Sequence, residues 1–134
     1  MLQLQVETIS ACSARCVFCT YPSMRRQRGR MEDTVFRKIL SDAKDLEMFI
    51  DRVSLQGLGE PLMDKAIVER VYQAKETFPD AEVSVYTNGT FLTPLMTARL
   101  KAAGLSLLVV SLTGSNAAER EAAMRGRGEF AGCL

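Results

Sequence analysis

The 134-residue sequence contains no histidine, and this absence narrows the metal sites that it can form. Without histidine the chain cannot build the common zinc sites that combine cysteine and histidine ligands. An excess of charge of one sign is also missing, because 17 basic and 16 acidic residues leave a net charge of +1. Such a balance does not favour a polyanion as partner. The remaining composition, 47% apolar and 25% charged, is typical of one soluble domain with a sizeable core.

Long apolar runs are absent as well. The longest, from Leu105 to Leu112, is interrupted by serine and is far too short to span a bilayer. The first residues lack the basic segment and apolar stretch of a secretory signal. Because clustered thiols without such a signal indicate a reducing compartment, we expect a cytoplasmic location.

Cysteine is scarce, but three of the four cysteines lie within eight residues, at Cys12, Cys16 and Cys19. This C-x3-C-x2-C spacing can turn three thiolates toward one point, which is how proteins hold a soft metal or an iron–sulfur cluster. An ordinary cubane cluster takes four cysteines, so three would leave one iron open to another ligand.

The cysteines also allow three simpler roles. A zinc site of four thiolates would need Cys133, which is next to last in the sequence, where chains fray unless tied down. A disulfide framework would need a small secreted chain with several pairs. The three clustered thiols could also be buried or incidental.

Apolar periodicity predicts strands and helices in alternation. Strands are expected over residues 2–8, 51–56, 82–87 and 105–111. Helices are expected over residues 33–49, 64–78 and 93–104. Such alternation implies right-handed crossovers and a parallel sheet, so we expect an α/β fold. For residues 112–134 the sequence predicts a loop with a possible short helix.

Local signals mark some of the boundaries. Asp33 and Thr93 are suitable N-cap residues, and Gly104 suits the position that follows a helix C-terminus. The run from Leu105 to Ser111 is almost continuously apolar, which favours a strand covered on both faces.

Each predicted strand is followed by an unusual sequence. The cysteines follow the first, Gly57-Leu58-Gly59-Glu60-Pro61 the second, Thr87-Asn88-Gly89 the third and Ser111-Leu112-Thr113-Gly114 the fourth. In parallel β/α folds the carboxyl ends of the strands share one face, and active sites lie there. We therefore expect these four segments to form one site.

These segments resemble the radical S-adenosylmethionine (SAM) superfamily, and the resemblance covers nearly the whole chain. The triad Cys12, Cys16 and Cys19 matches the cluster motif of that superfamily, and the segment 57–61 resembles its Gly-Gly-Glu-Pro motif. The subgroup that looks most similar often carries extra C-terminal cluster domains of the SPASM or twitch type. That similarity rests on residues 29–40, 87–89 and 125–126.

The resemblance implies a chemistry. Cys12, Cys16 and Cys19 would hold a [4Fe–4S] cluster, and the amino and carboxylate groups of SAM would bind the open iron. Reductive cleavage of SAM would give a 5′-deoxyadenosyl radical that abstracts hydrogen from a peptide or small-molecule substrate. The electron would come from a flavodoxin- or ferredoxin-type donor.

The resemblance also implies contacts with SAM. Glu60 and its neighbours would accept hydrogen bonds from the SAM ammonium, and Phe18 would pack near the adenine. Ser111 and Arg125 resemble positions that contact the ribose and the carboxylate. The full expected set is Phe18, Gly57, Gly59, Glu60, Thr87, Asn88, Ser111 and Arg125. Ordinary roles remain open for these residues, as a core aromatic, as turns, or as surface and capping groups.

The sequence departs from the family pattern in two respects. The family often has Asp where this chain has Thr113, and its usual core is a six-stranded partial barrel, of which four strands are predicted here. We therefore expect residues 1–134 to be a radical SAM core domain truncated after the fourth strand, a partial (β/α) barrel. A non-enzymatic iron–sulfur or metal-binding module on a degraded scaffold and a bare redox iron–sulfur protein are the alternatives.

A basic loop follows the cysteines. Arg25, Arg26, Arg28 and Arg30 fall within six residues. The loop could simply be solvated, could contact an anionic substrate, or could dock an acidic electron donor near the cluster.

Overall fold

The computed structural model describes residues 2–46 and 49–124. Four parallel strands form one sheet in the order β1-β2-β3-β4. The strands are β1 (Gln3–Val6), β2 (Arg52–Leu55), β3 (Glu82–Thr87) and β4 (Leu107–Val110). The predicted α/β fold with parallel strands is confirmed.

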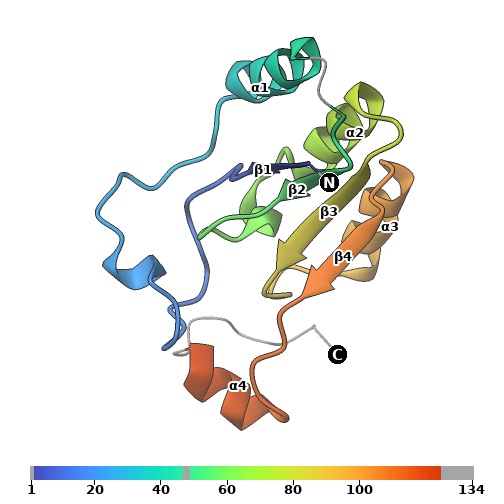
Figure 1. Ribbon diagram of the computed structural model, residues 1–134. Helices are drawn as coiled ribbons and strands as arrows, with labels where there is room; N and C mark the ends of the chain where they lie inside the picture. The colour runs from blue at the N-terminus through green and yellow to red at the C-terminus, as the bar shows by residue number, and fades with distance from the viewer. Residues whose placement is uncertain (1, 47–48, 125–134) are drawn as a thin grey trace.

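Helices alternate with the strands. They are α1 (Asp33–Asp45), α2 (Ile67–Thr77), α3 (Pro94–Ala102) and α4 (Ala117–Met124), with the short helical turns η1 (Tyr21–Ser23) and η2 (Pro61–Met63). Figure 1 shows α1, α2 and α3 along one side of the sheet and α4 beyond the carboxyl ends of β3 and β4. Among the described residues, no helix combines the length and the apolar character that a bilayer crossing requires.

The hydrophobic core lies between the sheet and helices α1 to α3. Val53 and Leu55 of β2 and Val83 and Val85 of β3 are fully buried in it. These residues share one face because successive side chains of a strand point to opposite sides of the sheet. The helices contribute Phe36, Leu40, Val71, Ala74 and Leu100.

The opposite face of the sheet is polar. The register places Gln5 beside Ser54 and Ser54 beside Ser84. Gln3 Nε2 donates to Ser54 Oγ at 2.9 Å, and the two serine hydroxyls are 2.8 Å apart. Buried polar groups in native proteins are almost always paired in this way. The sheet therefore has one apolar face covered by helices and an opposite face that carries polar and charged side chains over β1, β2 and β3, whereas β4 adds Leu107 and Val109 to it.

Two boundary signals are confirmed on α3. Thr93 caps the helix, and its side chain accepts a hydrogen bond from Met96 N at 3.1 Å. Gly104 follows the helix with a φ of +92°, a backbone conformation that favours glycine. Both residues act as the sequence predicts because capping depends on chemistry local to the helix end.

Two other predictions are wrong. Asp33 is the first residue of α1 and not its cap, because Glu32 occupies the cap position. The Asp33 carboxylate instead accepts hydrogen bonds from Arg30 at 2.6 Å and Arg70 at 3.1 Å. Strand β4 is not covered on both faces by the described residues, since Leu107 is 36% exposed and the other three residues of the strand are only half-buried.

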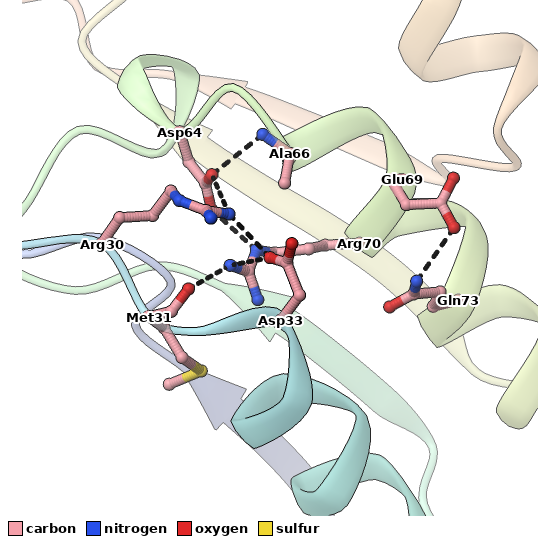
Figure 2. Close-up of polar contacts among 8 residues, drawn as sticks. All are labelled: Arg30, Met31, Asp33, Asp64, Ala66, Glu69, Arg70 and Gln73. Carbon is pink, nitrogen blue, oxygen red and sulfur yellow. Dashed lines mark hydrogen bonds and ion pairs between the residues drawn. The ribbon is translucent and has the colours of Figure 1, made fainter.

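A buried ion-pair network fixes two loops to α2 (Figure 2). Arg70 is 1% exposed, and its Nε donates to Asp64 Oδ2 at 2.8 Å. Arg70 Nη2 donates to the Met31 carbonyl at 2.5 Å and to Asp33 Oδ1 at 3.1 Å. The guanidinium also lies 4.8 Å from the centre of the Phe36 ring. The network therefore joins the chain that leaves the cysteine loop, at Met31, to the chain that follows η2, at Asp64.

Candidate active site at the carboxyl ends of the strands

A pocket of about 260 Å³ is formed by the segments that follow the four strands. We call it the cofactor pocket. Its lining includes Cys12, Cys16, Cys19, Phe18, Gly57, Gly59, Glu60, Thr87, Asn88 and Ser111. The structure thus brings together the predicted site residues that it describes. Arg125 and Cys133 lie outside the described residues.

The three clustered cysteines are half-buried, and none forms a disulfide. Burial raises the pKa of the Cys12 thiol, and the charges of Glu60 and the other two thiols raise it further. Burial and the charge of Cys19 likewise raise the pKa of Cys16. Over residues 2–46 and 49–124, no three cysteine or acidic side chains are arranged to hold a single metal ion. Three thiols at one pocket are instead a donor set suited to a cluster, in which different irons take different thiolates.

The helical turn η1 and the distant end of α4 hold the cysteine loop in place. Cys12 N–H donates to Tyr21 Oη at 2.9 Å, and Tyr21 is buried. Val17 N–H donates to the Ala123 carbonyl at 2.9 Å. Because carbonyls in the last turn of a helix lack intrahelical partners, the end of α4 and the cysteine loop complete each other's hydrogen bonds.

Asn88 reaches the cysteine loop from the end of β3. Its Nδ2 lies 3.2 Å from Ser13 Oγ and 3.8 Å from Cys12 Sγ. Its backbone carbonyl accepts a hydrogen bond from Arg120 of α4 at 2.5 Å. Asn88 therefore links the end of β3 to the cysteine loop and to α4, and its amide side chain faces one of the thiols.

Glu60 joins the ends of β2 and β3. Its Oε1 accepts hydrogen bonds from Thr87 Oγ1 at 2.6 Å and Leu62 N at 3.0 Å, and its Oε2 accepts one from Asn88 N at 2.7 Å. Glu60 is 2% exposed, and burial raises its pKa although these three hydrogen bonds oppose the shift. Each of these donors is a neutral group, so the bonds satisfy the carboxylate without compensating its charge.

The two glycines before Glu60 are required by close packing. A side chain at Gly57 would overlap the side chain of Glu7, and one at Gly59 would overlap the carbonyl of Ile9. Glu60 N also donates to the Ala11 carbonyl at 2.8 Å. The Gly-Leu-Gly-Glu segment thus lies directly against the chain that enters the cysteine loop.

Glu7 is a site residue that the sequence did not single out. Its Oε1 accepts hydrogen bonds from Leu58 N at 2.7 Å and Gly59 N at 3.2 Å, and its Oε2 pairs with Arg26. The signal that could have identified Glu7 is the alternation Gln3, Gln5, Glu7, which places it on the polar face of the sheet.

Thr113, the position at which the sequence departs from the family pattern, also belongs to the site. It lines the cofactor pocket, and its hydroxyl is buried with no partner among the described residues. A buried hydroxyl without a partner is costly, so this atom marks a place where a bound ligand could accept or donate a hydrogen bond. The two-residue spacing from Ser111 was the available signal.

The basic loop is largely occupied by contacts within the chain. Arg26 pairs with Glu7, Arg30 with Asp33, and Arg28 lies 4.7 Å from the centre of the Tyr21 ring. Three of its four arginines therefore fasten the loop to the rest of the molecule.

Comparisons with known proteins agree on the family and the fold. The sequence model of the Radical SAM superfamily matches residues 6–131. The S-adenosyl-L-methionine-dependent 2-deoxy-scyllo-inosamine dehydrogenase of Niallia circulans is 30% identical over 109 residues, covering 81% of this chain and 43% of that protein. The GTP 3′,8-cyclase of Limosilactobacillus fermentum is 32% identical over 113 residues, covering 81% of this chain and 32% of that protein.

Among solved structures, BtrN in complex with AdoMet and 2-DOIA is similar with a TM-score of 0.77 and 27% sequence identity. The match covers 87% of this chain and 48% of that structure. The chain thus spans less than half the length of each of these relatives. The expected partial barrel is confirmed by this likeness, whereas the SPASM or twitch subgroup stays a prediction.

Proposed function

The chain belongs to the radical SAM superfamily, and on that premise we propose that it binds a [4Fe–4S] cluster and SAM in the cofactor pocket. Members of this superfamily use both cofactors and receive electrons from reductants. When bound, they supply a 5′-deoxyadenosyl radical that abstracts hydrogen from a peptide or small-molecule substrate. The observation that carries the proposal is that three thiols and Glu60, from different strand ends, line one pocket.

In this proposal Cys12, Cys16 and Cys19 are the cluster ligands. The hydrogen bonds from the loop to Tyr21 and Ala123 hold the three thiols at the pocket before a cluster arrives. Such preorganisation lowers the cost of ordering the loop on binding. The amide of Asn88, 3.8 Å from Cys12 Sγ, is placed to stabilise a thiolate there.

Glu60 would receive the ammonium group of SAM. A carboxylate offers about four lone-pair sites, and neutral groups of the chain occupy three of them here. A cation that entered the pocket would supply the missing charge compensation.

The other expected contacts with SAM come from the same pocket. Phe18 would contact the adenine, and Gly57 and Gly59 would allow close approach of the backbone. Thr87 and Asn88 would hold Glu60 in place. Ser111 and Arg125 would contact the ribose and the carboxylate.

A flavodoxin- or ferredoxin-type protein would supply the electron. Phe18 is 65% exposed and Val17 is 57% exposed beside the thiols, so the cysteine loop can be approached from outside. Residues 8–31 hold five arginines and no acidic residue, which suits an acidic donor.

We also propose that residues 1–134 are part of a radical SAM core domain and do not turn over a substrate alone. Among the described residues β4 lies at an edge of the sheet, and an edge strand offers unpaired backbone groups, which invites association. Size-exclusion chromatography combined with an assay for 5′-deoxyadenosine tests this. A stable monomer that cleaves SAM at about 1 per second or faster would contradict it.

The cluster assignment is tested by anaerobic reconstitution followed by iron and sulfide analysis. We expect about four irons and four sulfides per chain. Cys12→Ala, Cys16→Ala and Cys19→Ala should each abolish the cluster, whereas the matched control Cys133→Ala should keep it. Stoichiometric zinc without iron, or equal loss in the control, would overturn the assignment.

SAM binding separates the enzyme from the alternative of a metal-binding module on this scaffold. SAM added to the reduced cluster should change its electron paramagnetic resonance spectrum, because the amino acid part of SAM binds the open iron. A spectrum that stays unchanged at saturating SAM would favour the module.

A further inference from the structure

A second pocket, of about 680 Å³, lies on the polar face of the sheet. Its lining is Gln5, Glu7, Arg26, Gln56, Gly57 and Leu58. Gln56 and Gly57 also line the cofactor pocket. The two pockets therefore share a wall, and a molecule in the polar pocket would lie directly beside a molecule in the cofactor pocket.

We propose that this polar pocket binds the substrate, and that the substrate is a small, hydroxyl-rich molecule without a polyanionic group. The proposal rests on the proposed function, because hydrogen abstraction requires the substrate to lie next to the cofactor. It goes beyond that function by naming the residues of a substrate site and the chemical class that they select.

The amides of Gln5 and Gln56 carry the first part of the argument. Gln56 Nε2 donates to Gln5 Oε1 at 3.3 Å, and both residues line the pocket. This contact leaves two amide atoms without a hydrogen bond to any described residue. They are the donor Gln5 Nε2 and the acceptor Gln56 Oε1. A hydroxyl group both donates and accepts, so adjacent hydroxyls of a ligand match such a pair.

The charge of the pocket carries the second part. Glu7 and Arg26 are its only ionisable residues among those described, and they form an ion pair with each other. A triphosphate or a comparable polyanion needs several cations in place, and here the single guanidinium already has a carboxylate beside it. The lining thus argues against a triphosphate substrate such as GTP. This holds although the chain is about as similar to the GTP 3′,8-cyclase (32% identity) as to the dehydrogenase (30% identity).

The apolar content of the pocket carries the third part. Leu58 is its one large apolar side chain, and the described lining contains no aromatic ring. An apolar ring would bury little apolar surface here and would remove water from the two glutamines without replacing their hydrogen bonds. A ring that carries several hydroxyl groups would replace them.

Ligand binding to the cofactor-free chain tests the class of substrate. Three probes of graded chemistry are scyllo-inositol, cyclohexanol and GTP, each titrated by saturation-transfer NMR. We expect scyllo-inositol to bind most tightly. Gln5→Leu and Gln56→Leu should each weaken its binding about five-fold, as expected for the loss of one hydrogen bond. Gln73→Leu is the matched control, because Gln73 lies in α2 and bonds to Glu69.

The outcomes separate this inference from the proposed function. Tighter binding of GTP or cyclohexanol, or equal weakening in Gln73→Leu, would overturn the inference even if the chain assembles a cluster and responds to SAM. Selective binding of scyllo-inositol that depends on Gln5 and Gln56 would support the site. That support would stand even if cluster assembly failed, since the measurement uses no cofactor. Circular dichroism of each variant tests whether the substitution leaves the fold intact.

Discussion

Two buried carboxylates lie four residues apart and have opposite surroundings. Asp64 is 1% exposed and pairs with the buried guanidinium of Arg70 at 2.8 Å (Figure 2). Glu60 is 2% exposed and accepts hydrogen bonds from two backbone N–H groups and the hydroxyl of Thr87. Asp64 lies beside the α1–α2 layer, whereas Glu60 lines the cofactor pocket.

The difference teaches how this chain separates structure from function. The charge of Asp64 is compensated inside the protein, so Asp64 and Arg70 serve the fold. The carboxylate of Glu60 is hydrogen-bonded by neutral donors, and burial raises its pKa. A carboxylate with a perturbed pKa in a pocket is a typical feature of a ligand site. Four substitutions or conditions can break or sharpen this comparison.

The largest expected effect is on the structural side. Arg70→Met removes one partner of the buried pair and leaves Asp64 uncompensated, which should lower the free energy of unfolding by about 3–5 kcal/mol. Urea denaturation measures the loss. Arg99→Met, at an exposed position on α3, is the control and should change little. A loss in Arg70→Met no greater than in the control would show that the network does not stabilise the fold.

This network also shows why part of the molecule could not be predicted from sequence. The strands and helices follow from patterns of period two and 3.6, and the site follows from unusual residues at strand ends. Arg70 pairs with the buried Asp64 six residues away, but it also donates to the Met31 carbonyl, 39 residues away, and to Asp33, 37 residues away. No local pattern encodes the two distant contacts. The same holds for the bond between Val17 and Ala123. The prediction of Asp33 as a helix cap is wrong: its carboxylate bonds to Arg30, three residues earlier, and to the distant Arg70 of α2.

A smaller loss of stability is expected when a substitution displaces the backbone beside Glu60 and leaves every charge unchanged. In Gly59→Ala the added methyl group meets the carbonyl of Ile9, and overpacking of this kind costs about 1–3 kcal/mol. Thermal unfolding measures it. Gly29→Ala is the matched control, because a side chain at Gly29 meets no atom within 4 Å. Similar melting temperatures for the two variants would contradict the close packing of this segment.

The role of Glu60 in binding SAM is tested by neutralising each of the two carboxylates in turn. Glu60→Gln removes the charge that would meet the SAM ammonium, and loss of a hydrogen bond to a charged group should weaken SAM binding about ten-fold or more. Titration of SAM into the reduced cluster, followed by electron paramagnetic resonance, gives the affinity. Asp64→Asn should instead lower stability and leave the SAM affinity of the folded protein nearly unchanged. If Asp64→Asn weakened SAM binding as much as Glu60→Gln, the distinction between the two carboxylates would fail.

The smallest effect is a pH dependence of stability that belongs to Glu60. Burial raises the pKa of this carboxyl above its ordinary value of 4.5. A raised pKa in the folded state contributes stability that is fully present below the unfolded pKa and is lost as the pH rises through the folded pKa. Glutamine cannot ionise, so the stability of Glu60→Gln relative to the unsubstituted chain should increase as the pH rises from about 4 toward about 7. Urea denaturation of both cofactor-free proteins across this range measures the change. If the difference stayed constant, or moved in favour of the unsubstituted chain, the hydrogen bonds from Thr87, Leu62 and Asn88 would outweigh burial. Glu60 would then resemble Asp64, a carboxylate that the fold itself stabilises in its charged form.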